Sequence, residues 1–288
     1  MSDSISIIGG DSRQLYAAEY LINRGYKVSI FACEHGKFPE KAKRCTDIEN
    51  AMNNEIIILP LPVTKNGSIL NAPLSANEIK IKDITDRINE GHTVFYGMGS
   101  ISLSRHIQAK SRRSIDYYNI EQLIYKNALL TAEGLISIIL DKIPTTLFGM
   151  NIAVTGYGRI SFFVADKLHK LGAKVSIFAR NELQLVKAES MGYSTYQLKE
   201  ISKKIAAYDC LINTIPYPVI DRYCINNSKK DCVFIEAASA PYGIDADACS
   251  DAERILIKAF SLPGKTAPKS AGIIIGETID SVLKGVNS

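Results

Sequence analysis

Short apolar runs alternate with longer amphipathic segments along the chain. In the clearest stretch, an apolar run (Ile152 to Thr155) ends in a glycine turn, a helix-like segment follows through Leu171, and a second apolar run covers Lys174 to Phe178. Apolar runs bounded by turn residues and separated by helical segments are typical of buried parallel strands joined by right-handed crossovers. The pattern therefore predicts the α/β fold class, with doubly wound parallel sheets.

The pattern of the first half recurs in the second. Leu21 to Ala32 reads L-I-N-R-G-Y-K-V-S-I-F-A, Leu168 to Ala179 reads L-H-K-L-G-A-K-V-S-I-F-A, and the same offset aligns Gly9 with Gly156. At a slightly larger offset, E-I-I-I-L-P-L-P (residues 55–62) resembles D-C-L-I-N-T-I-P (residues 209–216). This shared order of strand, glycine turn, helix and strands predicts two Rossmann-like domains joined by inter-domain helices.

The glycine turn of the second half has the spacing of a dinucleotide-binding loop. Gly156 permits a tight turn after the strand, and Gly158 lets the backbone approach a pyrophosphate, which the N–H groups and partial positive charge of the following helix would hold. Ser161 takes the place of a third Gly or Ala and still permits close packing of helix on strand. The predicted cofactor-binding residues of this loop are Gly156, Tyr157, Gly158, Arg159 and Ile160.

The residues that follow the next strand bear on the choice of cofactor. NAD-specific sites usually have Asp or Glu there, since a carboxylate binds the ribose hydroxyls and repels a 2′-phosphate. This chain has Arg180 followed by Asn181, which favours NADP(H); the alternative is a solvated surface arginine. Asn213 and Thr214 end a later strand, and ligands of such sheets lie beyond the carboxyl ends of the strands. We therefore expect both residues to edge the nicotinamide pocket.

The corresponding turn of the first half lacks the second glycine. It reads G-G-D-S-R (residues 9–13), with Asp11 in the place of Gly158, and a carboxylate there would repel a pyrophosphate. We therefore expect the first domain to have lost nucleotide binding. Ser12 and Arg13, at the start of the following helix, suit a smaller anion such as a carboxylate. The alternative is a capping Asp or Ser beside an exposed arginine.

Two segments connect the halves. Asn127 to Asp141 is apolar on most faces, which predicts a helix buried between the domains, and Glu133 within it would then need a partner or a function. Residues 261–269 (S-L-P-G-K-T-A-P-K) mark a crossing back, and Ser270 to Leu283 has a helical period. We therefore expect a substrate (catalytic) domain of residues 1–126 with 265–288, and an NADP-binding domain of residues 127–264.

The composition fits a globular protein of two domains. The 288 residues are 46% hydrophobic and 22% charged, and the net charge of +4 is too diffuse to indicate nucleic acid. No run reaches the roughly 18 apolar residues of a membrane span, and a strand begins at once, without a signal peptide. The four histidines make no metal pattern, and the six cysteines include no C-x-x-C. They predict reduced, mostly buried thiols in a cytoplasmic protein.

Several motifs are spread over nearly the whole chain. They are G-G-D-S-R-Q near the N-terminus, N-A-L-L-T-A-E-G before the glycine turn, then G-x-G-R, F-A-R, I-N-T-I-P and L-P-G-K-T-A-P-K-S-A-G. Together they resemble the family of the dipicolinate synthase A-subunit, which itself resembles two-domain 2-hydroxy-acid and alanine dehydrogenases. The chain departs from the family's pattern at Ser161, where Gly is usual, and in the helix opening, where Ala-Leu-Leu stands for a Ser-Ile-Pro-like run.

The resemblance implies the final step of dipicolinic acid synthesis, in the mother cell of a sporulating bacterium. A dihydrodipicolinate-level intermediate from the lysine pathway would be oxidised to pyridine-2,6-dicarboxylate, with NADP as the implied cofactor. A second, flavoprotein-like protein (the dipicolinate synthase B-subunit) usually accompanies such a chain, and we also expect a homo-oligomer.

The gain of aromaticity would drive such an oxidation, so the main task of the protein is to position the ring against the nicotinamide. The candidates for binding the substrate carboxylates are Ser12, Arg13 and Lys269, with Lys265 a further cation nearby. Lys269 and Glu133 are the candidate catalytic residues, Glu133 as a proton acceptor or as the group that orients a base. A purely structural carboxylate is the alternative for Glu133.

Two other functions stay open. One is another NAD(P)-dependent dehydrogenase of a small carboxylic acid; its hydroxy-acid version is disfavoured, because those enzymes use a late histidine as acid and base, and no histidine follows His169. The other is a non-catalytic NADP-binding protein that regulates a partner. A turnover assay separates an enzyme from such a regulator.

Overall fold

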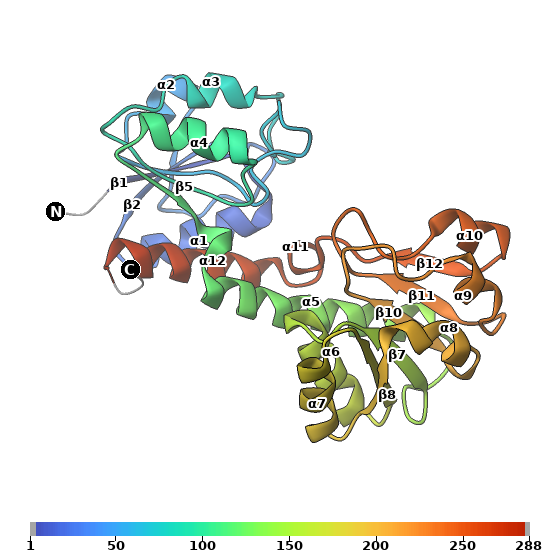
Figure 1. Cartoon of the computed structure of the whole chain (residues 1–288). Helices are drawn as coiled ribbons and strands as arrows, with labels where there is room; N and C mark the ends of the chain where they lie inside the picture. The colour runs from blue at the N-terminus through green and yellow to red at the C-terminus, as the bar shows by residue number, and fades with distance from the viewer. Residues whose placement is uncertain (1–3, 286–288) are drawn as a thin grey trace. The chain divides into compact units, whose positions relative to one another are not determined.

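The computed structural model describes residues 4–285, and the chain divides into two compact units. Unit 1 consists of Met1–Asn127 and Pro263–Ser288, and unit 2 consists of Ala128–Leu262. Each unit contains a six-stranded parallel sheet with helices against its faces (Figure 1). The predicted fold class, two Rossmann-like α/β domains, is confirmed.

The two sheets have the same topology. The strands of unit 1 are β1 (Ser4–Ile8), β2 (Lys27–Phe31), β3 (Lys43–Arg44), β4 (Ile56–Ile58), β5 (Thr93–Tyr96) and β6 (Arg113–Asp116). Those of unit 2 are β7 (Asn151–Thr155), β8 (Lys174–Ala179), β9 (Ser194–Gln197), β10 (Cys210–Asn213), β11 (Val233–Glu236) and β12 (Ile255–Lys258). The spatial orders are β3-β2-β1-β4-β5-β6 and β12-β11-β10-β7-β8-β9. Counted within its own unit, each sheet thus has the order 3-2-1-4-5-6 of dinucleotide-binding folds.

The helices differ widely in length. In the chain order of unit 1 they are α1 (Ser12–Asn23), α2 (Ile48–Ala51), α3 (Ile81–Thr85), α4 (Ile101–Lys110) and α12 (Pro268–Leu283). In unit 2 they are α6 (Arg159–Lys170), α7 (Glu182–Ser190), α8 (Ile201–Lys204), α9 (Arg222–Asn226) and α10 (Ala246–Asp251). Helices α5 (Glu121–Lys142) and α11 (Leu262–Thr266) contain the two unit boundaries.

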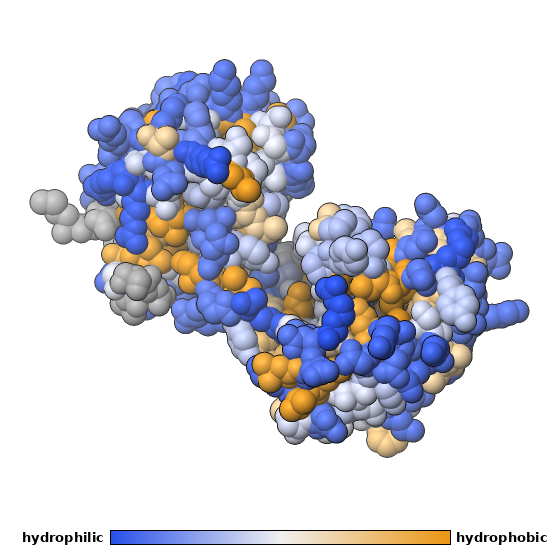
Figure 2. Space-filling model, viewed as in Figure 1, coloured by the Kyte–Doolittle hydropathy of each residue, from blue (hydrophilic) through white to orange (hydrophobic). Residues whose placement is uncertain are grey.

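The strands are apolar on both faces, because helices cover both faces of each sheet. In unit 1, Ile5 and Ile7 of β1 belong to the core under α1 and α12, whereas Ile8 belongs to the core on the opposite face, with Ile57 of β4. This period of two places successive side chains in different cores and explains why the strands read as continuous apolar runs. Most of the visible surface of each unit is correspondingly hydrophilic (Figure 2).

The cysteines contribute thiols to these cores. All six are free, and all but Cys45 are buried. Burial raises the pKa of Cys33 and of Cys224 to about 12. These thiols are therefore protonated and unreactive at neutral pH, as the sequence predicts for reduced, buried cysteines.

The C-terminal helix α12 returns to unit 1 and packs along α1, beside which it lies in Figure 1. Glycines make this approach possible. A Cβ at Gly272 would lie 2.4 Å from the backbone oxygen of Arg13 and 2.5 Å from Cβ of Tyr16, and one at Gly276 would lie 2.8 Å from the ring of Tyr20. The two glycines, one helical turn apart, thus let α12 contact the backbone of α1 directly.

Helix α5 differs from its prediction in length and in exposure. It begins at Glu121, before the predicted Asn127, and only part of its surface is buried, with Leu135 and Ile139 in the core of unit 2. Among the described residues, α5 is also the one helix long and apolar enough, by length and composition, to cross a membrane. The core helix of a globular domain passes the same test, so this is weak evidence for a membrane span.

We predict that Gly272→Ala destabilises the fold. Helix propensity alone favours alanine by about 1 kcal/mol. The new methyl group would overlap the backbone of α1, and such overpacking typically costs about 1–3 kcal/mol. The free energy of unfolding, measured by chemical denaturation, should therefore fall. Ser270→Ala, at an exposed position of the same helix, is the matched control and should change it little. A Gly272→Ala variant that is more stable than the parent would contradict the close packing.

Candidate functional site

The turn after β7 has the geometry of a dinucleotide-binding loop. Gly156 has φ +81°, a left-handed conformation that favours glycine, and its N–H donates to the carbonyl of Phe178 on β8 (2.8 Å). A Cβ at Gly156 would lie 3.0 Å from Oγ1 of Thr214 and 3.1 Å from Cγ1 of Ile215. The backbone turns here with no room for a side chain.

Gly158 leaves the first turn of α6 open. It is the N-cap residue of this helix, and it has no side chain to accept from the free N–H groups. A Cβ added at Gly158 would meet no atom within 4 Å. The N-terminus of α6, with its unsatisfied donors and partial positive charge, is therefore available to an anion of a ligand.

Ser161 replaces the usual small residue without disturbing this loop. It is fully buried, and its Oγ lies 2.7 Å from Oγ1 of Thr214. Because Thr214 donates its own hydroxyl hydrogen to the carbonyl of Thr155 (2.8 Å), Ser161 is the donor of the pair. Both hydroxyls thus brace the turn, so Thr214 fixes the loop and does not offer a free donor at its edge.

Asn213 also has an internal role. It is fully buried, its Oδ1 accepts from Thr155, and its Nδ2 donates to Oε1 of Glu236 (2.7 Å). The sequence predicts that Asn213 edges the nicotinamide pocket, but its side chain has no group left for a ligand in this structure. Its place at the end of β10 instead ties β7 to β11.

Glu236 is a buried carboxylate that our sequence analysis missed. Besides Asn213, it accepts from the backbone N–H groups of Ala238 (3.0 Å), Gly243 (2.7 Å) and Ile244 (2.9 Å). These bonds hold the segment after β11 across the carboxyl edge of the sheet. The available signal was an acidic residue directly after the apolar run V-F-I, where a buried carboxylate must have several donors.

The end of β8 exposes a cation beside an aromatic ring. Arg180 is exposed, and its guanidinium carbon lies 5.8 Å from the ring centroid of Tyr217, which follows β10 and is itself 59% exposed. Asn181 is the N-cap of α7, and its Oδ1 accepts from the N–H of Leu183 (2.8 Å). Tyr217 is a second residue that the sequence analysis missed, because only the fold brings it to Arg180.

The remaining loop residues contribute in different ways. Tyr157 is buried, its ring packs edge-on against Phe162 and Tyr193, and burial raises the pKa of its hydroxyl. Its backbone is therefore what it can offer to a ligand. Arg159, the first residue of α6, is exposed, and Ile160 is half-buried against the core.

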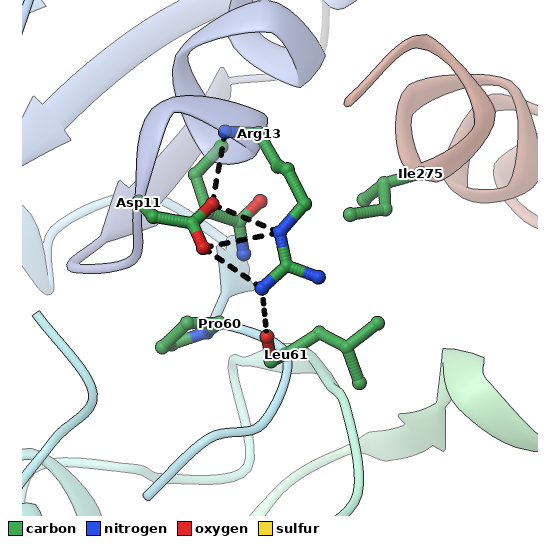
Figure 3. Close-up of a pocket in the computed structure, with 6 residues that line it drawn as sticks. Asp11, Arg13, Pro60, Leu61 and Ile275 are labelled. Atoms are coloured by element: carbon green, nitrogen blue, oxygen red, sulfur yellow. Dashed lines mark hydrogen bonds and ion pairs between the residues drawn. The ribbon is translucent and has the colours of Figure 1, made fainter. Parts of the chain in front are cut away.

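The equivalent turn of unit 1 contains its own anion. Gly9 has φ +71° and donates to the carbonyl of Phe31 (2.9 Å), as Gly156 does to its own second strand. Asp11 is the N-cap of α1, in the place of Gly158, and accepts from the N–H of Arg13 (3.0 Å). Figure 3 shows that the Arg13 guanidinium grips the same carboxylate, with Nε–Oδ1 at 2.9 Å and Nη2–Oδ2 at 2.9 Å, and also donates to the carbonyl of Leu61.

The chain after β4 crosses the rest of this edge. The N–H of Gly10 donates to the carbonyl of Asn71 (2.8 Å), and further along, the N–H of Ala76 donates to Glu34 (3.0 Å) just beyond β2. Residues 71–76 thus run from the turn after β1 to the end of β2, the path that a dinucleotide takes in such folds. Protein atoms and the Asp11 carboxylate occupy that path, which agrees with the expected loss of nucleotide binding in unit 1.

The structure brings one predicted cation segment to Arg13. A Cβ at Gly264 of α11 would lie 3.1 Å from Nε of Arg13, so this helix rests against the ion pair. The next residue, Lys265, is exposed, as is Lys269 at the second position of α12. Ser12, the first residue of α1, is half-buried beside them in sequence. A small pocket at Arg13 is lined by Asp11, Arg13, Gln14, Pro60, Leu61 and Ile275 (Figure 3).

The prediction that Glu133 is buried was wrong. Its side chain is 51% exposed, and Oε1 lies 3.1 Å from Nζ of Lys167. The helical face that carries Glu133 is not the face that enters the core, so the carboxylate is solvated and has a partner. The reason for assigning it a catalytic role is therefore gone. No group of three or more metal-binding side chains occurs within residues 4–285.

Comparisons with known proteins cover the whole chain. A family model described as the N-terminal domain of the dipicolinate synthase A-subunit matches residues 4–118. The A-subunit of dipicolinate synthase from Bacillus subtilis (strain 168) is 28% identical over 99% of this chain and 97% of its own. The crystal structure of the same protein from Bacillus halodurans superimposes with a TM-score of 0.90 at 26% identity, covering 98% of this chain and 97% of that chain.

The resemblance to the dipicolinate synthase A-subunit is confirmed. A wider likeness of fold extends to the transhydrogenase from Sinorhizobium meliloti, with a TM-score of 0.72 at 14% identity, covering 98% of this chain and 94% of that chain. A nicotinamide dinucleotide is the class of cofactor that this dehydrogenase-like fold and the open α6 N-terminus fit.

We predict that Gly158→Asp removes dinucleotide binding, because it builds into unit 2 the carboxylate that Asp11 provides in unit 1. Like charges brought together at a binding site cost several kcal/mol, so affinity for NADPH and NADH should fall at least about a hundredfold. Binding is measured by the fluorescence of the reduced cofactor.

Gly158→Ser, which offers a cap without a charge, is the matched control and should lose less affinity. The melting temperature of both variants without cofactor should match the parent, because the site has open space for a side chain. A Gly158→Asp protein that binds as tightly as the parent would show that the pyrophosphate does not lie at α6.

Proposed function

We propose that the protein catalyses the NADP-dependent oxidation of a dihydrodipicolinate-level intermediate of the lysine pathway to dipicolinate. The observation that carries this proposal is the uncapped N-terminus of α6 at Gly158, in a chain whose whole length resembles the dipicolinate synthase A-subunit. Unit 2 would bind the cofactor, and unit 1, whose equivalent turn is filled by Asp11, would bind the substrate.

NADP(H) is the proposed cofactor. The pyrophosphate would bind the N–H groups at the start of α6, and Arg180 would bind the 2′-phosphate through its exposed guanidinium. Asn181 is neutral and already caps α7, so no carboxylate opposes the phosphate there. Tyr217, beside Arg180, offers an exposed ring against which an adenine can stack. When bound, NADP⁺ supplies a hydride acceptor.

The substrate is a dicarboxylate, and the cations of unit 1 suit it. Asp11 fixes the orientation of the Arg13 guanidinium, whose Nη1 is turned away from Asp11 (Figure 3) and has no partner among residues 4–285. We propose that one carboxylate binds Nη1 of Arg13 together with Ser12 and Lys265, and that Lys269 binds the other. Oxidation then removes a hydride from a ring carbon and a proton from the ring nitrogen; the proton leaves to water.

The cellular setting is part of the same proposal. By the resemblance, the protein would act in the cytoplasm of the mother cell of a sporulating bacterium, as a homo-oligomer. Its relatives are named as one lettered component of a synthase, which implies a partner protein. We propose a flavoprotein-like B-subunit in that role.

A turnover assay tests the proposal. Purified protein is mixed with NADP⁺ and the lysine-pathway intermediate, with and without a flavoprotein-like B-subunit, and the absorbance of pyridine-2,6-dicarboxylate is followed together with that of NADPH. Equal amounts of both products are expected. Reduction of NADP⁺ with another small carboxylic acid alone would favour a different two-domain dehydrogenase. Binding without turnover of any acid would favour a non-catalytic regulatory protein.

Arg180→Asp should reverse or abolish the preference for NADPH over NADH, since the new carboxylate repels the 2′-phosphate and can bind ribose hydroxyls. Dissociation constants for both cofactors are measured by fluorescence titration. Lys187→Asp, an exposed position on α7 with the same change of charge, is the control and should keep the preference. Equal affinity of the unmodified protein for NADPH and NADH would contradict the proposed role of Arg180.

Lys269→Ala and Lys265→Ala should each weaken the binding of dipicolinate by about tenfold to a hundredfold, because a charge-assisted hydrogen bond is worth about 1.5–3 kcal/mol. Their affinity for NADPH should stay that of the parent. The measurement is isothermal titration calorimetry with dipicolinate. Lys27→Ala, at the exposed amino end of β2, controls for the loss of general positive charge. If both variants bind dipicolinate like the parent, this placement of the substrate is refuted.

A further inference from the structure

The segment after β4 encloses a second cavity in unit 1. Residues 64–80 form a small antiparallel arrangement, with bridges between Thr64 and Leu70 and between Ile69 and Lys80. The cavity has a volume of about 340 Å³, which is in the range of small-molecule sites. Its wall includes Lys65, Asn71, Ser75 and Glu78, with apolar side chains between them.

Asn71 is the buried polar residue of this wall. Its side chain belongs to a residue that is only 4% exposed, and three hydrogen bonds fix it. Its N–H donates to Val63 (2.9 Å), its carbonyl accepts from Gly10 (2.8 Å), and its Nδ2 donates to the carbonyl of Pro62 (2.9 Å).

The remaining group of Asn71, the amide oxygen Oδ1, has no partner among the described residues. A buried acceptor without a donor costs free energy, and native structures rarely leave one so. Rotation of the amide would not solve this, because it would set Oδ1 against the carbonyl oxygen of Pro62. The cavity therefore presents a fixed acceptor that calls for an N–H or O–H donor, with an ammonium group at Lys65 for an acid.

We propose that this cavity holds the ring of the substrate, and that Asn71 separates substrate from product by accepting the ring N–H. This inference rests on the proposed function. A dihydropyridine dicarboxylate carries a ring N–H that can donate to Oδ1 while Lys65 attracts a carboxylate. After the hydride and the N–H proton have left, the pyridine nitrogen presents a lone pair to the same oxygen. Two acceptors then face each other, so the aromatic product is held less tightly than the substrate.

A pair of ligands that differ at the ring nitrogen tests this inference. Piperidine-2,6-dicarboxylate donates from its ring nitrogen, whereas pyridine-2,6-dicarboxylate only accepts, and both carry the same two carboxylates. Titration calorimetry on the full chain should show at least about a tenfold preference for the piperidine acid. Asn71→Ala should lose that preference. Since the variant leaves the charges of both ligands and of the site unchanged, the loss isolates the hydrogen bond.

Asn54→Ala is the matched control, because Asn54 is also an internally bonded amide of unit 1, donating to Ser6 (2.9 Å), and does not line the cavity. It should keep the preference. If Asn71→Ala does not fold, the side-chain amide resonances of Asn71 in the ¹⁵N-labelled parent decide. They should shift on addition of the piperidine acid and much less with the pyridine acid.

Three results would overturn the inference: equal binding of both acids by the parent, a preference that survives in Asn71→Ala, or Asn71 resonances that move with neither acid, in which case the cavity holds water only. The failure of the proposed function has a different signature. If the ligand preference depends on Asn71 but no NADP⁺-dependent turnover occurs, the site stands and the reaction falls. If turnover occurs while the preference ignores Asn71, only this inference falls.

Discussion

The free N–H groups at the start of a helix after the first strand of a Rossmann-like sheet must find an acceptor, and the rest of this protein depends on where each unit finds one. Unit 1 supplies its own carboxylate, Asp11, which caps α1 and also binds Arg13. Unit 2 has Gly158 in that place and leaves the donors of α6 to a ligand. One side chain thus separates a closed turn from an open one on otherwise equivalent backbones.

The surroundings of the two turns follow this difference. In unit 2, a chain of buried hydrogen bonds from Ser161 through Thr214 to Thr155 holds the loop before any ligand arrives. Such preorganisation lowers the entropic cost of binding. In unit 1, residues 71–76 cover the path that a dinucleotide would need, and the segment that covers it encloses a cavity with Asn71 in its wall. The loss of one ligand site therefore accompanies the formation of another kind of site.

The C-terminal return completes unit 1. Gly272 lets α12 contact the backbone of α1, and this contact brings α11, with Gly264, against the Arg13 guanidinium. The last part of the chain therefore adds its lysines to a turn that lies near its beginning. A two-domain dehydrogenase-like fold with one open dinucleotide loop and one closed, cation-bearing turn suits a reaction between a nucleotide cofactor and a small acid, which is the chemistry that the relatives' name indicates.

The sequence by itself determined the fold class, because apolar strands, glycine turns and their repeat are local patterns that few topologies satisfy. It also determined the contrast between Gly158 and Asp11, since glycine and aspartate differ at a position whose backbone the repeat already fixes. The roles of particular polar side chains were decided only by tertiary structure. Asn213 is satisfied by Glu236, and Glu133 lies on the solvated face of α5, because burial and partners depend on residues distant in sequence. For the same reason, only the folded chain brings Tyr217 to Arg180 and leaves the Asn71 amide oxygen without a donor.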